Sequence, residues 1–141
     1  MEHMTSEQAR AFLRVGTRTA KLATTTRDGQ PHVVPVWFVL DGTALVFTTH
    51  ETSVKARALR RDPRVSLCVD DETPPYAFVT VQGVASLDTD LAALRRWATA
   101  IGERYMGADR GEEFGARNGV PGELLVRVTP TKVLGRDGMA A

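Results

Sequence analysis

Residues 48–67 read TTHETSVKARALRRDPRVSL, and this segment contains the end of a strand, a short helix and the start of a new strand. Thr52 or Ser53 is suited to begin the helix, because a side-chain hydroxyl accepts a hydrogen bond from a free N–H of the first turn. Pro63 disfavours helical backbone at Asp62, so the helix should end there. The segment therefore predicts a basic helix between two strands.

The start of this helix has the composition of an anion site. The first N–H groups of a helix have no partner within it and lie at the positive end of its dipole. The hydroxyls of Thr48, Thr49 and Ser53 and the ammonium of Lys55 add further donors, and phosphate is often bound in this way. The same residues also fit a capped surface helix with solvated charges. Spacing alone leaves both interpretations open.

The composition is that of one globular domain covering residues 1–141, with 43% hydrophobic and 25% charged residues. A net charge of +1 argues against a general nucleic-acid binder. No run approaches the roughly 18 apolar residues of a membrane span, and no signal-peptide segment is found at the N-terminus. We therefore expect a cytoplasmic protein.

The cysteine and the histidines predict neither a disulfide nor a metal site. Cys68 is the only cysteine and lies in an apolar run, where a buried packing role is expected. His3, His32 and His50 have no ligand-type spacing to one another or to Cys68.

Turn residues divide much of the chain into hairpins. Asp28-Gly29 and Asp41-Gly42 are typical of tight turns between strands. Consecutive hairpins indicate an antiparallel sheet and an α+β fold, and closure into a small barrel would remove the exposed edges. The six predicted strands are 19–25, 32–40, 44–48, 65–69, 76–87 and 124–129, the last resuming at 132–134.

Two of these strands have unusual features. Strand 32–40 is apolar on both faces, so we expect it to be covered on both sides, and Pro35 leaves a gap in its hydrogen-bond ladder. Gly83 is expected to mark a bulge in strand 76–87.

Three further helices are predicted around the sheet. Thr5-Ser6-Glu7-Gln8 is a capping box that begins a helix closed by Gly16. Apolar residues at helical spacing predict a second helix over 91–105, capped by Asp88 or Asp90. A shorter helix is expected over 109–118.

Several motifs together resemble the split β-barrel oxidoreductases of the pyridoxamine-phosphate-oxidase-like superfamily, which bind flavin or deazaflavin. The similarity covers residues 19–133, and its closing segment 121–133 looks like actinobacterial members that use coenzyme F-420. The matching segments are 22–25, 28–29, 31–38, 46–49, 53–56, 59–67, 81–83, 121–128 and 130–133.

The resemblance implies a six-stranded antiparallel split β-barrel with flanking helices, and a homodimer with two cofactors between its subunits. It places the isoalloxazine-like ring against the backbone around Pro35, Val36 and Trp37, and the phosphate at the anion site predicted above. Trp37 either flanks the ring or fills the barrel. The cofactor-binding residues expected on this basis are Pro35, Val36, Trp37, Thr48, Thr49, Ser53, Val54, Lys55, Ala56, Arg60 and Arg61.

The chain departs from flavin-using members at one position. They commonly carry Arg-Lys where this chain has Val54-Lys55, so a bidentate phosphate partner is lost. This favours F-420, whose tail carries a phosphodiester followed by several glutamate carboxylates, over FMN. Arg60 and Arg61 are expected along that tail or, alternatively, in water at the end of the helix. Arg57 and Arg64 are expected to be solvated.

The implied activity is hydride transfer between reduced F-420 and an electrophilic double bond of a small apolar substrate. Alternatives are an FMN-dependent oxidase or reductase and a non-catalytic cofactor-binding protein. No catalytic acid is identified: His50, Tyr76 and Tyr105 are conceivable proton donors, but a structural role is favoured for each. Segment 104–118 is a candidate lid, because it is polar and contains glycines.

Overall fold

A computed structural model describes residues 1–141 as an antiparallel sheet flanked by helices, which confirms the predicted α+β fold. The helices are α1 (Ser6–Arg14), α2 (Val54–Arg61), α3 (Leu91–Met106) and α4 (Gly111–Asn118), with a short 3-10 turn at Ala108–Arg110. The strands are β1 (Glu2–His3), β2 (Ala20–Thr25), β3 (Pro31–Val36), β4 (Val39–Asp41), β5 (Ala44–His50), β6 (Arg64–Asp71), β7 (Ala77–Asp88) and β8 (Glu123–Asp137).

The sheet is nearly closed on itself. Its strands follow the order β3-β2-β6-β7-β8-β5-β4, and β1 pairs with β8. The two edge strands, β3 and β4, are neighbours in the chain, joined only by Trp37-Phe38. The chain therefore crosses from one edge of the sheet to the other at these two residues, and the barrel is split there.

The prediction of one continuous strand over 32–40 is wrong. β3 pairs only with β2 and β4 pairs only with β5, so the chain changes partner strand at Trp37-Phe38. The apolar residues at 33–40 form an unbroken run across the change of partner. The pattern therefore contains no signal for the change of partner.

A bulge is found at Gly83, but its extra residue lies on the partner strand β8 and not in strand 76–87 as expected. Gln82 pairs with Lys132 whereas Gly83 pairs with Pro130, which leaves Thr131 as the extra residue on β8. A Cβ atom at Gly83 would lie 2.6 Å from the carbonyl oxygen of Thr129. Glycine thus allows the two backbones to approach, and β8 continues beyond the bulge to Asp137.

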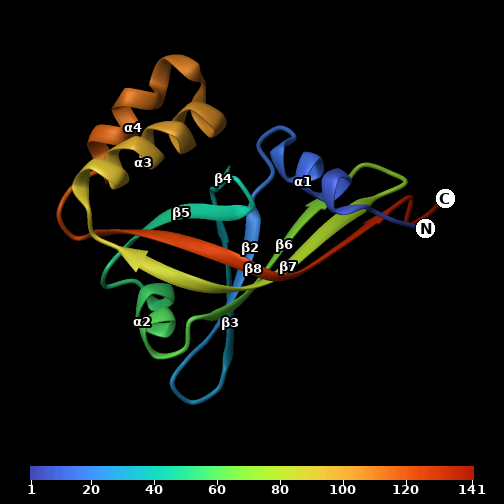
Figure 1. The fold of residues 1–141 in the computed structure, drawn as a ribbon, viewed down its shortest axis with the longest axis horizontal. Helices are drawn as coiled ribbons and strands as arrows, with labels where there is room; N and C mark the ends of the chain where they lie inside the picture. Colours follow the sequence, from blue (N-terminus) through green and yellow to red (C-terminus); the bar gives the residue numbers. More distant parts are fainter.

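The helices surround the sheet at separate places (Figure 1). The capping box at Thr5 and Gln8 is confirmed at the start of α1, and Asp90 caps α3 by accepting a hydrogen bond from the N–H of Ala93. In Figure 1, α3 and α4 form a hairpin on one side of β5, and α2 lies on the other side. None of these helices combines the length and hydrophobicity that a bilayer span requires.

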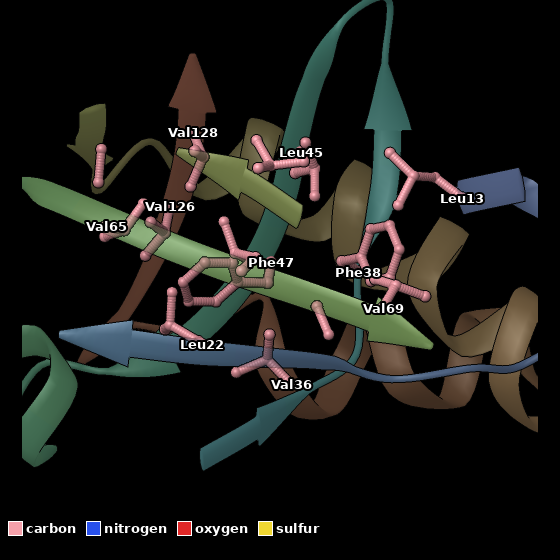
Figure 2. Packing of buried hydrophobic residues seen from close by; sticks show 14 of the residues in the cluster. Leu13, Leu22, Val36, Phe38, Leu45, Phe47, Val65, Val69, Val126 and Val128 are labelled. Carbon is pink, nitrogen blue, oxygen red and sulfur yellow. The ribbon is translucent and has the colours of Figure 1, made fainter. Parts of the chain in front are cut away.

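The core fills the inside of the curved sheet, and α1 packs over one end of it. Phe38 and Phe47 are fully buried there. Figure 2 shows Phe47 amid side chains from β2, β6 and β8, including Leu22, Val65 and Val126. A second, smaller cluster of Val46, Leu94 and Leu125 attaches α3 to the outer side of β5 and β8.

The outer face of β3 is not covered within one chain, contrary to the expectation for strand 32–40. Val33 is 63% exposed, Pro35 is also exposed, and the following Trp37 is 38% exposed. Trp37 also contacts α3 and α4, through the rings of Tyr105 and Phe114, but keeps part of its indole exposed. These three residues form an apolar strip on the surface.

Candidate functional site

The start of α2 is built around the hydroxyl of Ser53. Its Oγ accepts a hydrogen bond from the N–H of Ala56 at 3.1 Å and lies 2.9 Å from Oγ1 of Thr49. The N–H groups of Val54 and Lys55 belong to the first turn and have no acceptor within the helix. Ser53 thus ties the helix to β5 and leaves two backbone donors for an anion.

Replacing Ser53 with alanine should lower the free energy of unfolding by about 1 kcal/mol, the usual effect of losing a cap. The N–H of Ala56 would lose its acceptor, and Thr49 would lose its hydroxyl partner. Chemical denaturation followed by circular dichroism measures the change. Ser66→Ala is the matched control, since Ser66 is exposed and forms no side-chain hydrogen bond. Equal stability of the two variants would contradict the prediction.

Lys55 is a half-buried cation in the first turn of α2. Its ammonium forms no ion pair and no hydrogen bond within the chain. Burial lowers the pKa of this group, and the carboxylate of Glu123 offsets part of the effect. Since a desolvated charge is costly, an anionic ligand would stabilise Lys55.

Thr48 and Thr49 lie on opposite faces of β5. Thr49 is buried on the inner face, where it meets Ser53, whereas Thr48 follows Val46 on the side that α3 covers. The side chains of the two threonines therefore do not converge on one point. His50, the last residue of β5, is exposed, and its Nδ1 lies 2.7 Å from Oγ1 of Thr52.

The arginines of α2 line a separate groove on its outward face. This groove has a volume of about 720 Å³ and no acidic residue in its wall. Arg60 donates to the carbonyl oxygen of Glu51 at 2.8 Å, and Arg61 donates to that of Thr25. Neither therefore caps the end of the helix. The lining residues are Thr26, Arg27, Val54, Arg57, Ala58, Arg60 and Arg61.

Arg57 and Arg64 have different surroundings. Arg57 forms no ion pair and lies in the groove, next to Arg60 and Arg61. Arg64 makes a two-pronged contact with the carboxylate of Asp62, through Nε at 3.0 Å and Nη2 at 2.8 Å. This hydrogen bonding lowers the pKa of Asp62 to about 2. Arg64 is therefore already neutralised, whereas Arg57 is free to bind an anion.

Trp37 lies at the crossing between β3 and β4. Its indole stacks on the ring of Tyr105, with centroids 5.0 Å apart and planes 3° apart. Phe114 approaches the same indole at 5.9 Å in a tilted geometry. Of the neighbours on β3, Val36 is buried and Pro35 is exposed. Trp37 thus stands at the surface rather than filling the barrel.

Two side chains of α3 hold the backbone of the crossing. The hydroxyl of Tyr105 accepts a hydrogen bond from the N–H of Phe38 at 3.2 Å and donates to the carbonyl oxygen of Arg18 at 2.9 Å. Burial raises the pKa of this hydroxyl, so it stays protonated at neutral pH. Arg104 donates to the carbonyl oxygens of Phe38, Leu13 and Gly16 at 2.8, 2.8 and 3.0 Å.

These contacts bear on the three conceivable proton donors. The proton of Tyr105 is held by a backbone carbonyl, which is the structural role favoured for this residue. Tyr76 is exposed and follows the Pro74-Pro75 bond in the loop before β7. His50 lies beside Ser53 at the start of α2, where its ring also approaches Gly122. No triad or carboxylate pair is formed around any of them.

Two of the three glycines in segment 104–118 allow close packing between helices. A Cβ atom on Gly115 would lie 2.1 Å from Oγ1 of Thr99, and one on Gly111 would lie 2.4 Å from Cγ of Glu103. These contacts place α4 tightly against α3. Gly111 and Gly115 are therefore explained by the close approach of two helices, whereas Gly107, with φ +115°, ends α3.

The predicted site residues form two groups connected by β5. Val46 pairs with Val39, next to the crossing, and Thr49 contacts Ser53 at the start of α2. Three residues of strand, or about 10 Å, separate these two points. The anion-binding group and the Trp37 group thus lie within reach of one elongated ligand.

Three residues at these sites were not identified from the sequence. Arg27 reaches the groove from the turn between β2 and β3, Glu123 lies near Lys55, and Arg104 holds the crossing. Each acts on an element distant in the sequence. The sequence gives an indication of Arg27 alone, because the Asp28-Gly29 pattern predicts a tight turn in which Arg27 is exposed.

A comparison with protein-family profiles identifies one family for nearly the whole chain. The profile described as Pyridoxamine 5'-phosphate oxidase matches residues 5–137. No match was found among functionally curated proteins.

Several solved structures are similar to this chain. The conserved hypothetical protein Rv2991 from Mycobacterium tuberculosis has a TM-score of 0.84 and 29% identity, covering 97% of this chain and 87% of that one. A structure described as an F-420 reductase has a TM-score of 0.72 and 26% identity, with coverages of 92% and 98%. The FAD binding protein from Mycobacterium smegmatis has a TM-score of 0.67 and 25% identity, with coverages of 96% and 98%.

Proposed function

Because this chain belongs to the pyridoxamine 5'-phosphate oxidase family, we propose that it is an oxidoreductase that uses coenzyme F-420. It transfers a hydride between the reduced deazaflavin and an electrophilic double bond of a small apolar substrate. The similar structures include an F-420 reductase and a FAD binding protein. They support a cofactor of the flavin or deazaflavin type.

The observation that carries this proposal is the unpartnered, half-buried ammonium of Lys55 beside the start of α2. The backbone N–H groups of Val54 and Lys55 belong to the same first turn, at the positive end of the helix dipole, and have no acceptor within the helix. A phosphate bound at the start of α2 would accept hydrogen bonds from the two N–H groups and would be attracted by the positive charge of Lys55. The residues present therefore fit the phosphate of such a cofactor.

The distribution of arginines favours F-420 over FMN. Arg57, Arg60 and Arg61 line the arginine groove, but Lys55 does not. The positive charges of α2 therefore lie on two sides of the start of the helix. Arg60 reaches back to Glu51, in the turn that precedes the helix. A phosphodiester held at Lys55 would thus continue toward Arg60 and Arg57. The glutamate carboxylates of the F-420 tail would pair with these arginines, whereas FMN has a single phosphate and no further anionic groups to pair with them.

The chain's residues would bind and orient, and the cofactor would supply the hydride chemistry when bound. In this proposal the backbone around Pro35 and Val36 and the indole of Trp37 form the wall for the ring, about 10 Å along β5 from the phosphate. Since no side chain at the crossing is free to donate a proton, we assign that role to solvent. Positioning is then the main contribution of the protein.

The uncovered strip of Val33, Pro35 and Trp37 supports a homodimer with the cofactor between its subunits. Edge strands with exposed apolar side chains are normally covered by a partner. A second subunit over this strip would bury the outer face of β3 and enclose the ring.

Binding isotherms for F-420 and FMN, measured side by side, test the proposal. We expect F-420 to bind more tightly, and its affinity to fall more steeply with salt because more charges take part. Turnover is then measured with enones, quinones, imines and nitro compounds. Tight F-420 binding without turnover would indicate a binding protein, and a protein that purifies with FMN would indicate the flavin enzyme.

Val54→Arg should raise the affinity for FMN by about tenfold, since a guanidinium adds a charge-assisted hydrogen bond to phosphate. Val54 is 48% exposed, so the longer side chain can be accommodated at the start of α2. Val15→Arg is the matched control, because Val15 is a similarly exposed valine just after α1. Fluorescence titration with FMN measures both variants. An unchanged FMN affinity would remove Val54 from the phosphate site.

A further inference from the structure

The sheet provides no hydrogen-bond partners for the backbone N–H and C=O groups of Phe38 at the crossing. β3 ends at Val36 and β4 begins at Val39, and the two strands belong to opposite edges. Phe38 therefore has no strand partner although its side chain is fully buried. Since unpaired buried backbone groups are costly, other donors and acceptors must replace the ladder here.

Tyr105 and Arg104 provide these replacements. The hydroxyl of Tyr105 binds the N–H of Phe38, and Nη1 of Arg104 binds its carbonyl oxygen. Arg104 also extends over the ring of Phe38, at 4.6 Å from the centroid. Both polar groups of one residue are thus fixed by two adjacent side chains of α3.

The same tyrosine orients the indole of Trp37. Its ring is pinned at the hydroxyl by Phe38 and Arg18 and offers its face to the indole, 5.0 Å away and nearly parallel. Phe38, the residue after Trp37, is anchored in the core. Trp37 is therefore restrained through its backbone and on one ring face, although it remains 38% exposed.

We propose that Tyr105 and Arg104 are positioning residues, which fix Trp37 as a rigid wall for the ring of the bound cofactor. This inference rests on the proposed function for the identity of the ring, but the restraint on Trp37 is a property of the chain alone. A flat, immobile indole sets the angle at which a planar ring system lies. The angle in turn decides how the hydride-carrying carbon meets the substrate.

The fluorescence of Trp37 reports this restraint without any cofactor. The chain has two tryptophans, so Trp97→Phe leaves Trp37 as the only emitter. In that background, Tyr105→Leu removes both the stacking and the hydrogen bonds, and Tyr105→Phe removes the hydrogen bonds alone. The matched controls are Tyr76→Leu and Tyr76→Phe, which alter the other, exposed tyrosine. Arg104→Lys is compared with Arg96→Lys.

We expect acrylamide to quench Trp37 more strongly in Tyr105→Leu than in its control, with smaller increases in Tyr105→Phe and Arg104→Lys. With F-420 bound, hydride transfer in Tyr105→Leu should slow by about tenfold to a hundredfold, as expected when reacting atoms are displaced. The dissociation constant should change less than threefold, because the phosphate is held at α2.

Quenching equal to that of the controls in folded Tyr105 and Arg104 variants would overturn the inference. If Tyr105→Leu does not fold, Tyr105→Phe and Arg104→Lys decide by the same measurement. A wild-type protein that fails to bind F-420 would refute the proposed function, whereas the quenching experiment would still decide whether Trp37 is restrained. A loss of affinity equal to the loss of rate would contradict a positioning role.

Discussion

Replacing Phe47 with alanine is expected to lower the free energy of unfolding by about 3–5 kcal/mol. Phe47 is fully buried on β5, and its ring contributes to the main core between the strands. The substitution removes apolar surface and leaves a cavity that a closely packed sheet fills only in part. Since domains of this size have about 5–15 kcal/mol in total, much of the stability would be lost. Urea denaturation followed by circular dichroism measures the change.

Phe47→Leu is the control for this prediction. It keeps an apolar side chain of comparable size and should cost less than about 1.5 kcal/mol. A loss below about 1 kcal/mol in the alanine variant would show that Phe47 does not lie in a closely packed core. Both variants also bear on the site, because β5 connects the crossing to the start of α2.

The local elements were predictable because their signals are contained in short segments. The cap at Ser53, the capping box at Thr5 and Gln8, and the bulge at Gly83 each depend on a few neighbouring residues. The change of strand partner at Trp37-Phe38 depends instead on which distant strand each half meets. The run of apolar residues over 33–40 continues through that change without interruption, so it does not mark the break.

In the candidate site, too, local features were predictable from the sequence and long-range contacts were not. Ser53 and Lys55 could be assigned to one helix start from their spacing. The opposite orientation of Thr48 and Thr49 follows from strand geometry, once β5 is known to continue through both. The roles of Arg104 and Tyr105 required the packing of α3 against the crossing, 66 and 67 residues away in the sequence. No local pattern carries that information.

Removing the side chain of Lys55 should weaken F-420 binding by roughly 1.5–3 kcal/mol, the loss of one charge-assisted hydrogen bond. The ammonium is half-buried and forms no ion pair or hydrogen bond within the chain, and the two N–H groups of the same helical turn have no acceptor in the helix. Stability should stay the same or rise, because a partly desolvated charge is removed. A residue selected for binding rather than for folding gives this combination. Lys132→Ala is the matched control, since Lys132 is an exposed lysine on β8.

The pH dependence separates a direct contact from an indirect effect of Lys55→Ala. Lys55 attracts an anion only while it is protonated, and burial lowers its pKa below the usual 10.5. The affinity of the wild type for F-420 should therefore fall as the pH rises through this lowered pKa, because the deprotonated amine no longer offers a charge. A bound phosphate favours the charged form and shifts the fall to higher pH. In Lys55→Ala this alkaline decline should be absent, whereas Lys132→Ala should retain it. An alkaline decline that persists in Lys55→Ala, or an affinity equal to that of the wild type, would place the phosphate elsewhere.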